Sequence, residues 1–186
     1  MGSNKKFDKV IVLDCEMSCW ADKQEQGAQR PEIIQIGICL LNMRTACIEE
    51  EQGYYIKPKY SVVSEYCTAL TNITPKMAKS GISLSDACNS IMKNYGSRNR
   101  IIATFGNDTK KFREDCLLKN AEYPFGQRII DVSIWFHLKD LMSNTNVGLM
   151  DCLKIAGLQF DGRQHDAVCD ARNTARLLIY LTRGRK

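Results

Sequence analysis

The stretch KVIVLDCEM, residues 9–17, decides how this chain folds, because its apolar run is typical of a buried β-strand. Two acidic residues, Asp14 and Glu16, interrupt the run where charged side chains are rare unless they are paired or bind a metal. Side chains alternate along a strand, so Asp14 and Glu16 project to one face and Cys15 projects to the other. Two neighbouring carboxylates repel each other unless a cation lies between them. The stretch therefore predicts a divalent-metal site on a strand, a kind of site that often serves phosphoryl chemistry.

Further strands are predicted on the C-terminal side of this one. After a polar loop at 22–30, EIIQIGICLLN (32–42) and TACIEEEQGYYIKP (45–58) have the composition of strands. Their short connections predict an antiparallel meander of three strands. RIIATF (100–105) and QRIIDV (127–132) predict two later strands, each followed by a helical pattern.

Helices are predicted between and after these strands. Residues 64–95 are helical in pieces, with Thr74 before Pro75 as one start and a capping box from Ser83 to Asp86 as another. Later helices are predicted just after Gly106, at 133–142, at 148–155 and at 166–181. The predicted core positions of the first and last of these are Phe112, Cys116, Leu117, Leu118, Val168, Ala171, Ala175, Leu178 and Leu181. The fold class is α/β, with one mixed sheet of a meander plus parallel strands, flanked by helices.

Length and composition favour one globular domain spanning 1–186, with 1–6 as a disordered N-terminus or expression remnant and 183–186 as a basic tail. No apolar stretch is long enough for a membrane span, and no signal peptide is expected. The nine scattered cysteines contain no CxxC pair, which argues against a zinc ribbon and for free thiols in an intracellular, reducing compartment, cytoplasmic or nuclear. The net charge of +5 lies in the second half, where residues 98–186 hold 15 basic and 10 acidic residues. That excess suits a polyanionic partner.

Three more polar residues occupy positions where strands end or helices begin. Asp108 directly follows the RIIATF strand, where active-site groups of open α/β sheets gather. Asp170 lies in the first turns of the last predicted helix, and His165 lies in the loop before it. From that loop, His165 can reach a metal that Asp170 binds from the helix. Each residue also has an alternative, purely structural role: Asp108 as a helix cap, His165 as a loop histidine, and Asp170 as an ion-pair partner of Arg172 or Arg176.

The blocks IVLDCEM, TFGNDTKKF and HDAVCDARNTARL, in this order, resemble the three motifs of the DEDDh family of 3′–5′ exonucleases, which have a ribonuclease-H-like fold. The stretches PEIIQIGICLL and YCTALTNIT resemble the ERI-1 and KapD-like branch, which processes short and structured RNA. The resemblance covers the chain from about Val10 to Leu181. It implies a metal-dependent enzyme that releases nucleoside 5′-monophosphates from the 3′ end of a nucleic acid, RNA more than DNA.

The resemblance also implies roles for single residues. Asp14 would bridge two Mg²⁺ or Mn²⁺ ions, Glu16 and Asp170 would complete the ligands of the first ion, and Asp108 would hold the second. His165 would be the general base. Further contacts to substrate are implied at Met17, Tyr66, Leu70 and Asn107. Relatives often carry a bulky or aromatic residue where this chain has Asn107, so base stacking on that side differs here.

Two other functions compete with this one. The first is a DNA 3′–5′ exonuclease of the proofreading or repair type, because a sequence does not display a contact to the RNA 2′-hydroxyl. The second is a catalytically silent nucleic-acid-binding module on the same fold. Against the module stands the joint occurrence of the five groups, since carboxylates without metal repel phosphate. The oligomeric state is not determined by the sequence.

Overall fold

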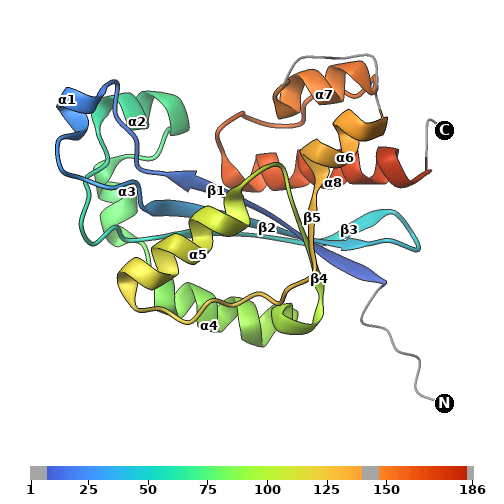
Figure 1. The fold of residues 1–186 in the computed structure, drawn as a ribbon, viewed down its shortest axis with the longest axis horizontal. Helices are drawn as coiled ribbons and strands as arrows, with labels where there is room; N and C mark the ends of the chain where they lie inside the picture. The colour runs from blue at the N-terminus through green and yellow to red at the C-terminus, as the bar shows by residue number, and fades with distance from the viewer. Residues whose placement is uncertain (1–7, 140–146, 184–186) are drawn as a thin grey trace.

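A computed structural model describes residues 8–139 and 147–183, and Figure 1 shows how its elements are arranged. One five-stranded sheet has the order β3-β2-β1-β4-β5. Its strands are β1 (Lys9–Met17), β2 (Ile33–Asn42), β3 (Cys47–Tyr55), β4 (Ile101–Thr104) and β5 (Ile129–Asp131). The helices are α1 (Lys23–Gln26), α2 (Glu65–Thr71), α3 (Pro75–Ser80), α4 (Leu84–Tyr95), α5 (Asp108–Lys119), α6 (Val132–Lys139), α7 (Leu149–Ile155) and α8 (Ala167–Arg183), with a 3₁₀ turn, η2 (Ser97–Asn99), before β4.

The first strand is the centre of the sheet. β1 pairs antiparallel with β2 and parallel with β4, so it joins the meander to the parallel strands. Its apolar side chains divide between two core clusters, with Ile11 and Leu13 in one and Val10 and Val12 in the other. Both faces of β1 are therefore buried along Val10 to Leu13, as the apolar run before Asp14 predicts. The predicted mixed sheet, its antiparallel meander and its parallel strands are confirmed.

Helices cover both faces of the sheet (Figure 1). One core cluster joins β1 to side chains of α4 and α5, including Ile91 and Phe112. The other joins β1 to α6, α7 and α8, through side chains such as Phe136, Leu153 and Leu178. Polar groups project from β1 on this second face, so α8 determines what surrounds them.

Local signals predicted most helix starts. Thr74 caps α3, with Pro75 in its first turn, and Ser83 accepts a hydrogen bond from the backbone N–H of Asp86 at the start of α4. The polar segment 22–30, predicted as a loop, contains the short helix α1, which Asp22 caps. Of the helix predicted at 133–142, the part to Lys139 is confirmed as α6, and the rest lies outside the described residues. The predictions for 1–6 and for most of the basic tail also lie outside them.

One predicted core position is exposed, and two others, Leu118 and Val168, are only half-buried. Leu117 on α5 is 78% exposed, whereas Phe112 and Cys116 are buried as predicted. The core-facing stripe of α5 follows the helical repeat through Phe112, Asp115 and Cys116, and Leu117 falls about 100° away from Cys116. Leu117 instead lines a surface cleft beside Met17.

All nine cysteines are free thiols, and six of them are buried. They therefore act mainly as small apolar core residues, as the sequence predicts. Among the described residues, no helix has the length and apolar character that crossing a membrane requires.

Candidate active site

The site lies at the C-terminal ends of β1 and β4, beside the start of α8. Asp14 and Glu16 share a face of β1 with Val10 and Val12, so they project toward the layer of α6, α7 and α8. Because β4 runs parallel to β1, its C-terminal end opens on the same edge. Asp108 is the first residue of α5, just beyond β4, and is buried at this edge.

Close packing of α8 on β2 brings Asp170 to the strand carboxylates. Gly37 on β2 lies directly opposite Asp14, and a Cβ atom at Gly37 would stand 2.0 Å from the carbonyl oxygen of Ala167, the first residue of α8. Only glycine allows a backbone to approach this closely. The next residue across the sheet, Gly53, would place a Cβ 2.8 Å from Val168.

A buried amide fixes the same helix start. Gln35 on β2 lies opposite Glu16, and its Oε1 accepts a hydrogen bond from the backbone N–H of Ala167 at 3.0 Å. Asp166 caps the helix, and its Oδ1 accepts from the N–H groups of Val168 and Cys169 at 3.0 and 3.2 Å. The helix start is therefore held both to the sheet and to its own preceding loop.

The five predicted catalytic residues meet in one cleft of about 430 Å³. Ligand atoms of Glu16, His165 and Asp170 lie within 4.8 Å of one another. Asp14 and Asp108 both line this cleft, and the charge of Asp108 contributes to the raised pKa of Asp14. The structure thus brings together all five groups, which are spread over more than 150 residues of sequence.

The carboxylates repel one another and are poorly hydrated. Burial is the largest cause that raises the pKa of Glu16 to about 7 and that of Asp170 to about 7. Burial also raises the pKa of Asp108 to about 6, although nearby Lys111 opposes the shift. The pKa of Asp14 is well above its usual range because it is buried and faces Asp108, Asp170 and Glu16.

This donor set fits a divalent cation of the Mg²⁺ or Mn²⁺ type. Such ions prefer oxygen ligands, and carboxylates that repel one another in a partly buried cleft are neutralised by binding them. Lys111, whose Nζ lies 3.8 Å from Asp108, is too weak a counter-charge for four carboxylates, since it is itself exposed.

His165 stands at the rim of the cleft in an unusual backbone conformation. Its φ is +57°, in the left-handed region that non-glycine residues seldom adopt. Its backbone N–H donates to the carboxylate of Asp170, and its side chain is exposed. The imidazole is thus held near the carboxylates while remaining accessible to water.

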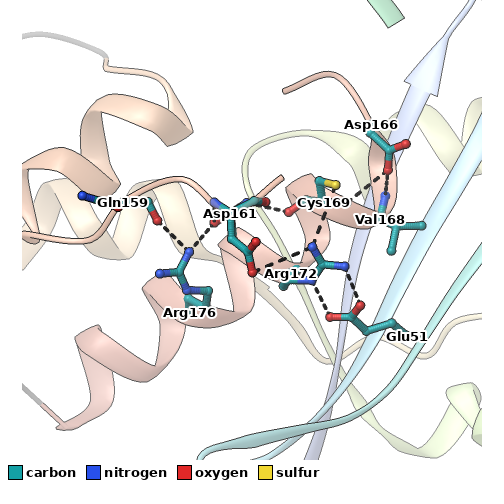
Figure 2. Close-up of polar contacts among 9 residues, drawn as sticks. Glu51, Gln159, Asp161, Asp166, Val168, Cys169, Arg172 and Arg176 are labelled. Atoms are coloured by element: carbon teal, nitrogen blue, oxygen red, sulfur yellow. Dashed lines mark hydrogen bonds and ion pairs between the residues drawn. The ribbon is translucent and has the colours of Figure 1, made fainter. Parts of the chain in front are cut away.

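The structure does not support the alternative structural roles of Asp108 and Asp170. The N-cap of α5 is Asn107, which makes no side-chain capping bond, and Asp108 instead points into the cleft. Figure 2 shows that Arg172 binds Glu51, with distances of 2.7 and 2.6 Å, while Arg176 donates to the carbonyl of Gln159. Neither arginine pairs with Asp170 in the contacts of the described residues.

The predicted substrate contacts lie around the cleft rather than in it. Met17, next to Glu16, lines a second cleft of about 630 Å³ between the β1–α1 connection and α5. Tyr66 on α2 is 46% exposed, and the carbonyl of Leu70 accepts a hydrogen bond from Arg163 at 3.2 Å. Asn107 is exposed at the start of α5. Tyr66, Leu70 and Asn107 line neither of these two clefts of the described chain, and their contact with substrate stays a prediction.

Sequence reasoning missed the residues that support the site. Gln35 and Gly37 position α8, and a polar residue and a glycine inside the apolar run EIIQIG were the signal that could have revealed them. Phe105 and Phe160 form apolar walls of the cleft, and nothing in their local sequence distinguishes them from core residues.

Comparison with known protein sequences places the chain in a family of exonucleases. A family model described as Exonuclease (RNase T) matches residues 11–178, so the chain belongs to this exonuclease family. The chain is 30% identical over 200 residues to human ERI1 exoribonuclease 2, an alignment that covers 94% of this chain and 28% of the relative. It is 28% identical to the 3′–5′ exonuclease Snipper of Drosophila melanogaster, over 95% of this chain and 70% of the relative. The predicted membership of the ERI-1 type of DEDDh 3′–5′ exonucleases is confirmed.

Solved structures confirm the ribonuclease-H-like fold. The nuclease domain of 3′hExo, described as a DEDDh family member bound to rAMP, superposes with a TM-score of 0.85 at 23% identity, over 98% of this chain and 96% of that one. The chain spans just over a quarter of the length of the ERI1 exoribonuclease 2 relatives. The DEDDh exonuclease family depends on divalent metal ions.

Proposed function

We propose that this chain is a metal-dependent 3′–5′ exoribonuclease that removes nucleoside 5′-monophosphates from RNA. The single observation that carries the proposal is the convergence of four carboxylates and one accessible histidine in a cleft at the strand ends. In the reaction, water attacks the phosphorus of the last phosphodiester bond. The bond to the 3′-oxygen of the preceding nucleotide breaks, and that oxygen takes up a proton.

The carboxylates would hold two ions, Mg²⁺ or Mn²⁺. Asp14, whose carboxyl is influenced by the charges of Asp108, Asp170 and Glu16, would contact both ions, Glu16 and Asp170 would complete the first, and Asp108 would hold the second. Ions bound in this way stabilise charge on the attacking and leaving oxygens. His165 would accept the proton of the attacking water, which its exposed imidazole can reach.

RNA as substrate is supported by the relatives and by charge. Curated relatives are named exoribonucleases, and one similar structure is described as a 3′-exonuclease that recognises the 3′ end of a histone mRNA stem-loop. The excess of basic residues lies in the second half of the chain, and Lys111 lines both clefts. Met17, Tyr66, Leu70 and Asn107 would contact the terminal nucleotides, with Tyr66 free to stack on a base.

The setting of the enzyme is also part of the proposal. Nine free thiols support an intracellular, reducing compartment. One sheet with a core on each face supports a single exonuclease domain. A DNA exonuclease and a silent binding module are less well supported, because relatives such as human ERI1 exoribonuclease 2 are named exoribonucleases and all five candidate catalytic groups are present.

The test is a time course on matched oligonucleotides. RNA and DNA of one sequence, labelled at the 5′ end, are incubated as single strands and as stem-loops with Mg²⁺, Mn²⁺ or EDTA, and the released product is identified by chromatography. We expect metal-dependent shortening from the 3′ end, 5′-monophosphates as product, and a faster rate on RNA. Oligonucleotides blocked at the 3′ end serve as the control. Equal rates on RNA and DNA would overturn the RNA preference, and the absence of shortening with Mn²⁺ would favour the binding module.

A further inference from the structure

The loop that carries His165 is held by contacts to other elements, one of which is the hydrogen bond from Arg163 to the carbonyl of Leu70. It runs from the end of α7 to the start of α8, and Asp161 and His165 are both exposed. Gly162 and His165 both have positive φ, at +90° and +57°. For His165 this conformation is disfavoured, so contacts from outside the loop must select it.

Asn173 makes such contacts from one turn further along α8 than Asp170. Its side chain is fully buried, and its Oδ1 accepts the backbone N–H of Asp161 at 3.0 Å. Its Nδ2 donates to the carbonyl of the same Asp161 at 2.8 Å and to that of Cys169 at 2.8 Å. One amide therefore binds both backbone groups of a single loop residue, as a neighbouring strand would.

Arg176 extends this contact by one more turn. Its Nη1 donates to Oδ1 of Asn173 at 2.7 Å and to the carbonyl of Gln159 at 2.7 Å. Figure 2 shows Arg176 reaching Gln159 from the helix, with Asp161 above the same helix. All four hydrogen-bonding positions of the Asn173 amide are thus used, so its orientation is fixed.

From these contacts we infer that Asn173, supported by Arg176, is a positioning residue for His165 and acts through the backbone of Asp161 in the same loop. The inference rests on the proposed function, in which His165 acts as general base. Because Asn173 and Asp170 belong to the same rigid helix, the loop carrying the base is fastened to the element that carries a metal ligand. Asn173 touches neither substrate nor metal in this scheme, and acts only through the loop.

The amide chemistry provides a sharp variant. Asn173→Asp keeps the size and the acceptor but removes both donated hydrogen bonds, to Asp161 and Cys169. We expect kcat to fall about 10- to 100-fold, the scale of a small misplacement of a catalytic group, with KM for RNA changed by less than about threefold. Arg176→Met keeps the apolar part of the side chain and is expected to lower kcat by a smaller factor, again with little change in KM. This variant replaces Asn173→Asp in the test if Asn173→Asp does not fold.

A second readout does not use activity. In amide hydrogen exchange, the Asp161 amide is expected to exchange at least about tenfold faster in Asn173→Asp than in the unchanged protein. The affinity for Mn²⁺, measured by calorimetry, is expected to change by less than about threefold, because the four carboxylates keep their places. Glu51→Gln is the matched control, since it weakens the Arg172 contact between α8 and β3 without touching Asn173.

A double-mutant cycle separates positioning from general support of the fold. In a His165→Ala background, Asn173→Asp is expected to cause no further loss of kcat, because the group that it positions is gone. An equal loss of kcat in both backgrounds, or unchanged exchange at Asp161, would overturn the inference. If the unchanged protein shortens no RNA with Mn²⁺, the proposed function fails instead, and the exchange result still reports on the loop.

Discussion

Asp14 is the residue on which the whole site depends. It lies on the central strand and faces three other carboxylates, those of Asp108, Asp170 and Glu16. A residue in this environment is unfavourable for folding and is retained for its function. His165 differs, because it is exposed at the rim and its loss leaves the four carboxylates in place.

Substitutions of Asp14 and His165 should therefore affect metal affinity and turnover differently. Asp14→Asn is expected to abolish turnover and weaken Mn²⁺ affinity by at least about tenfold, while raising the melting temperature of the metal-free protein because repulsion is relieved. His165→Ala is expected to spare Mn²⁺ affinity and lower kcat by about 10²- to 10⁴-fold. Calorimetry, thermal melting and single-turnover kinetics measure the three quantities. Near-normal activity of Asp14→Asn would disprove its central role.

At the scale of elements, the contact between β2 and α8 assembles the site. Gly37 admits the first residue of α8 against the sheet, and Gln35 binds that residue's N–H group. Neither residue is chemically reactive. They act because the carboxylate of Asp170 reaches β1 only when the helix starts this close to the strands.

Gly37→Ala tests that contact. The new Cβ would meet backbone atoms of Ala167 at 2.0 Å, so the helix start must move. We expect the free energy of unfolding to decrease by about 1–3 kcal/mol. We also expect the activity to decrease by more than the smaller fraction of folded protein accounts for, because Asp170 is displaced in the molecules that do fold. Denaturant unfolding and metal-dependent kinetics measure the two effects. Gly53→Ala, whose Cβ would meet only the Val168 side chain at 2.8 Å, is the graded control; an equally severe effect there would argue against the specific role of Gly37.

At the scale of the whole molecule, the clustered carboxylates link stability to pH and to metal. Glu16 and Asp170 have pKa values of about 7 in the folded protein, whereas the pKa of a carboxyl group in the unfolded chain is about 4. Between these values the folded state binds more protons than the unfolded state. Stability therefore falls as the pH rises through this window. The lowered pKa of Glu32 acts in the opposite sense, but only at more acidic pH.

We therefore expect the melting temperature of the protein in EDTA to decrease from about pH 5 to about pH 8. Mn²⁺ should raise the melting temperature most at the upper end, because the ion binds the deprotonated carboxylates and competes with protons. Melting curves with and without Mn²⁺ across this range measure both effects. A melting temperature in EDTA that rises with pH would contradict the arrangement of charges described here.

Much of the fold follows from local sequence. The apolar run of β1, the short connections of the meander and the capping signals at Thr74 and Ser83 predict elements that the structure contains. Leu117 was wrongly assigned to the core because its side chain is apolar, although the helical repeat through Phe112 and Cys116 places it off the core-facing stripe, where it lines a surface cleft.

The sequence by itself determined the candidate catalytic groups, because charged residues inside an apolar run and in ordered motifs stand out without a structure. Only the tertiary structure decided how they are held. Gln35, Gly37 and Asn173 act through backbone groups of residues that are distant along the chain or lie across a turn of helix. Such contacts depend on strand order, register and the approach of one element to another, whereas sequence periodicity records only which face of its own element a residue occupies.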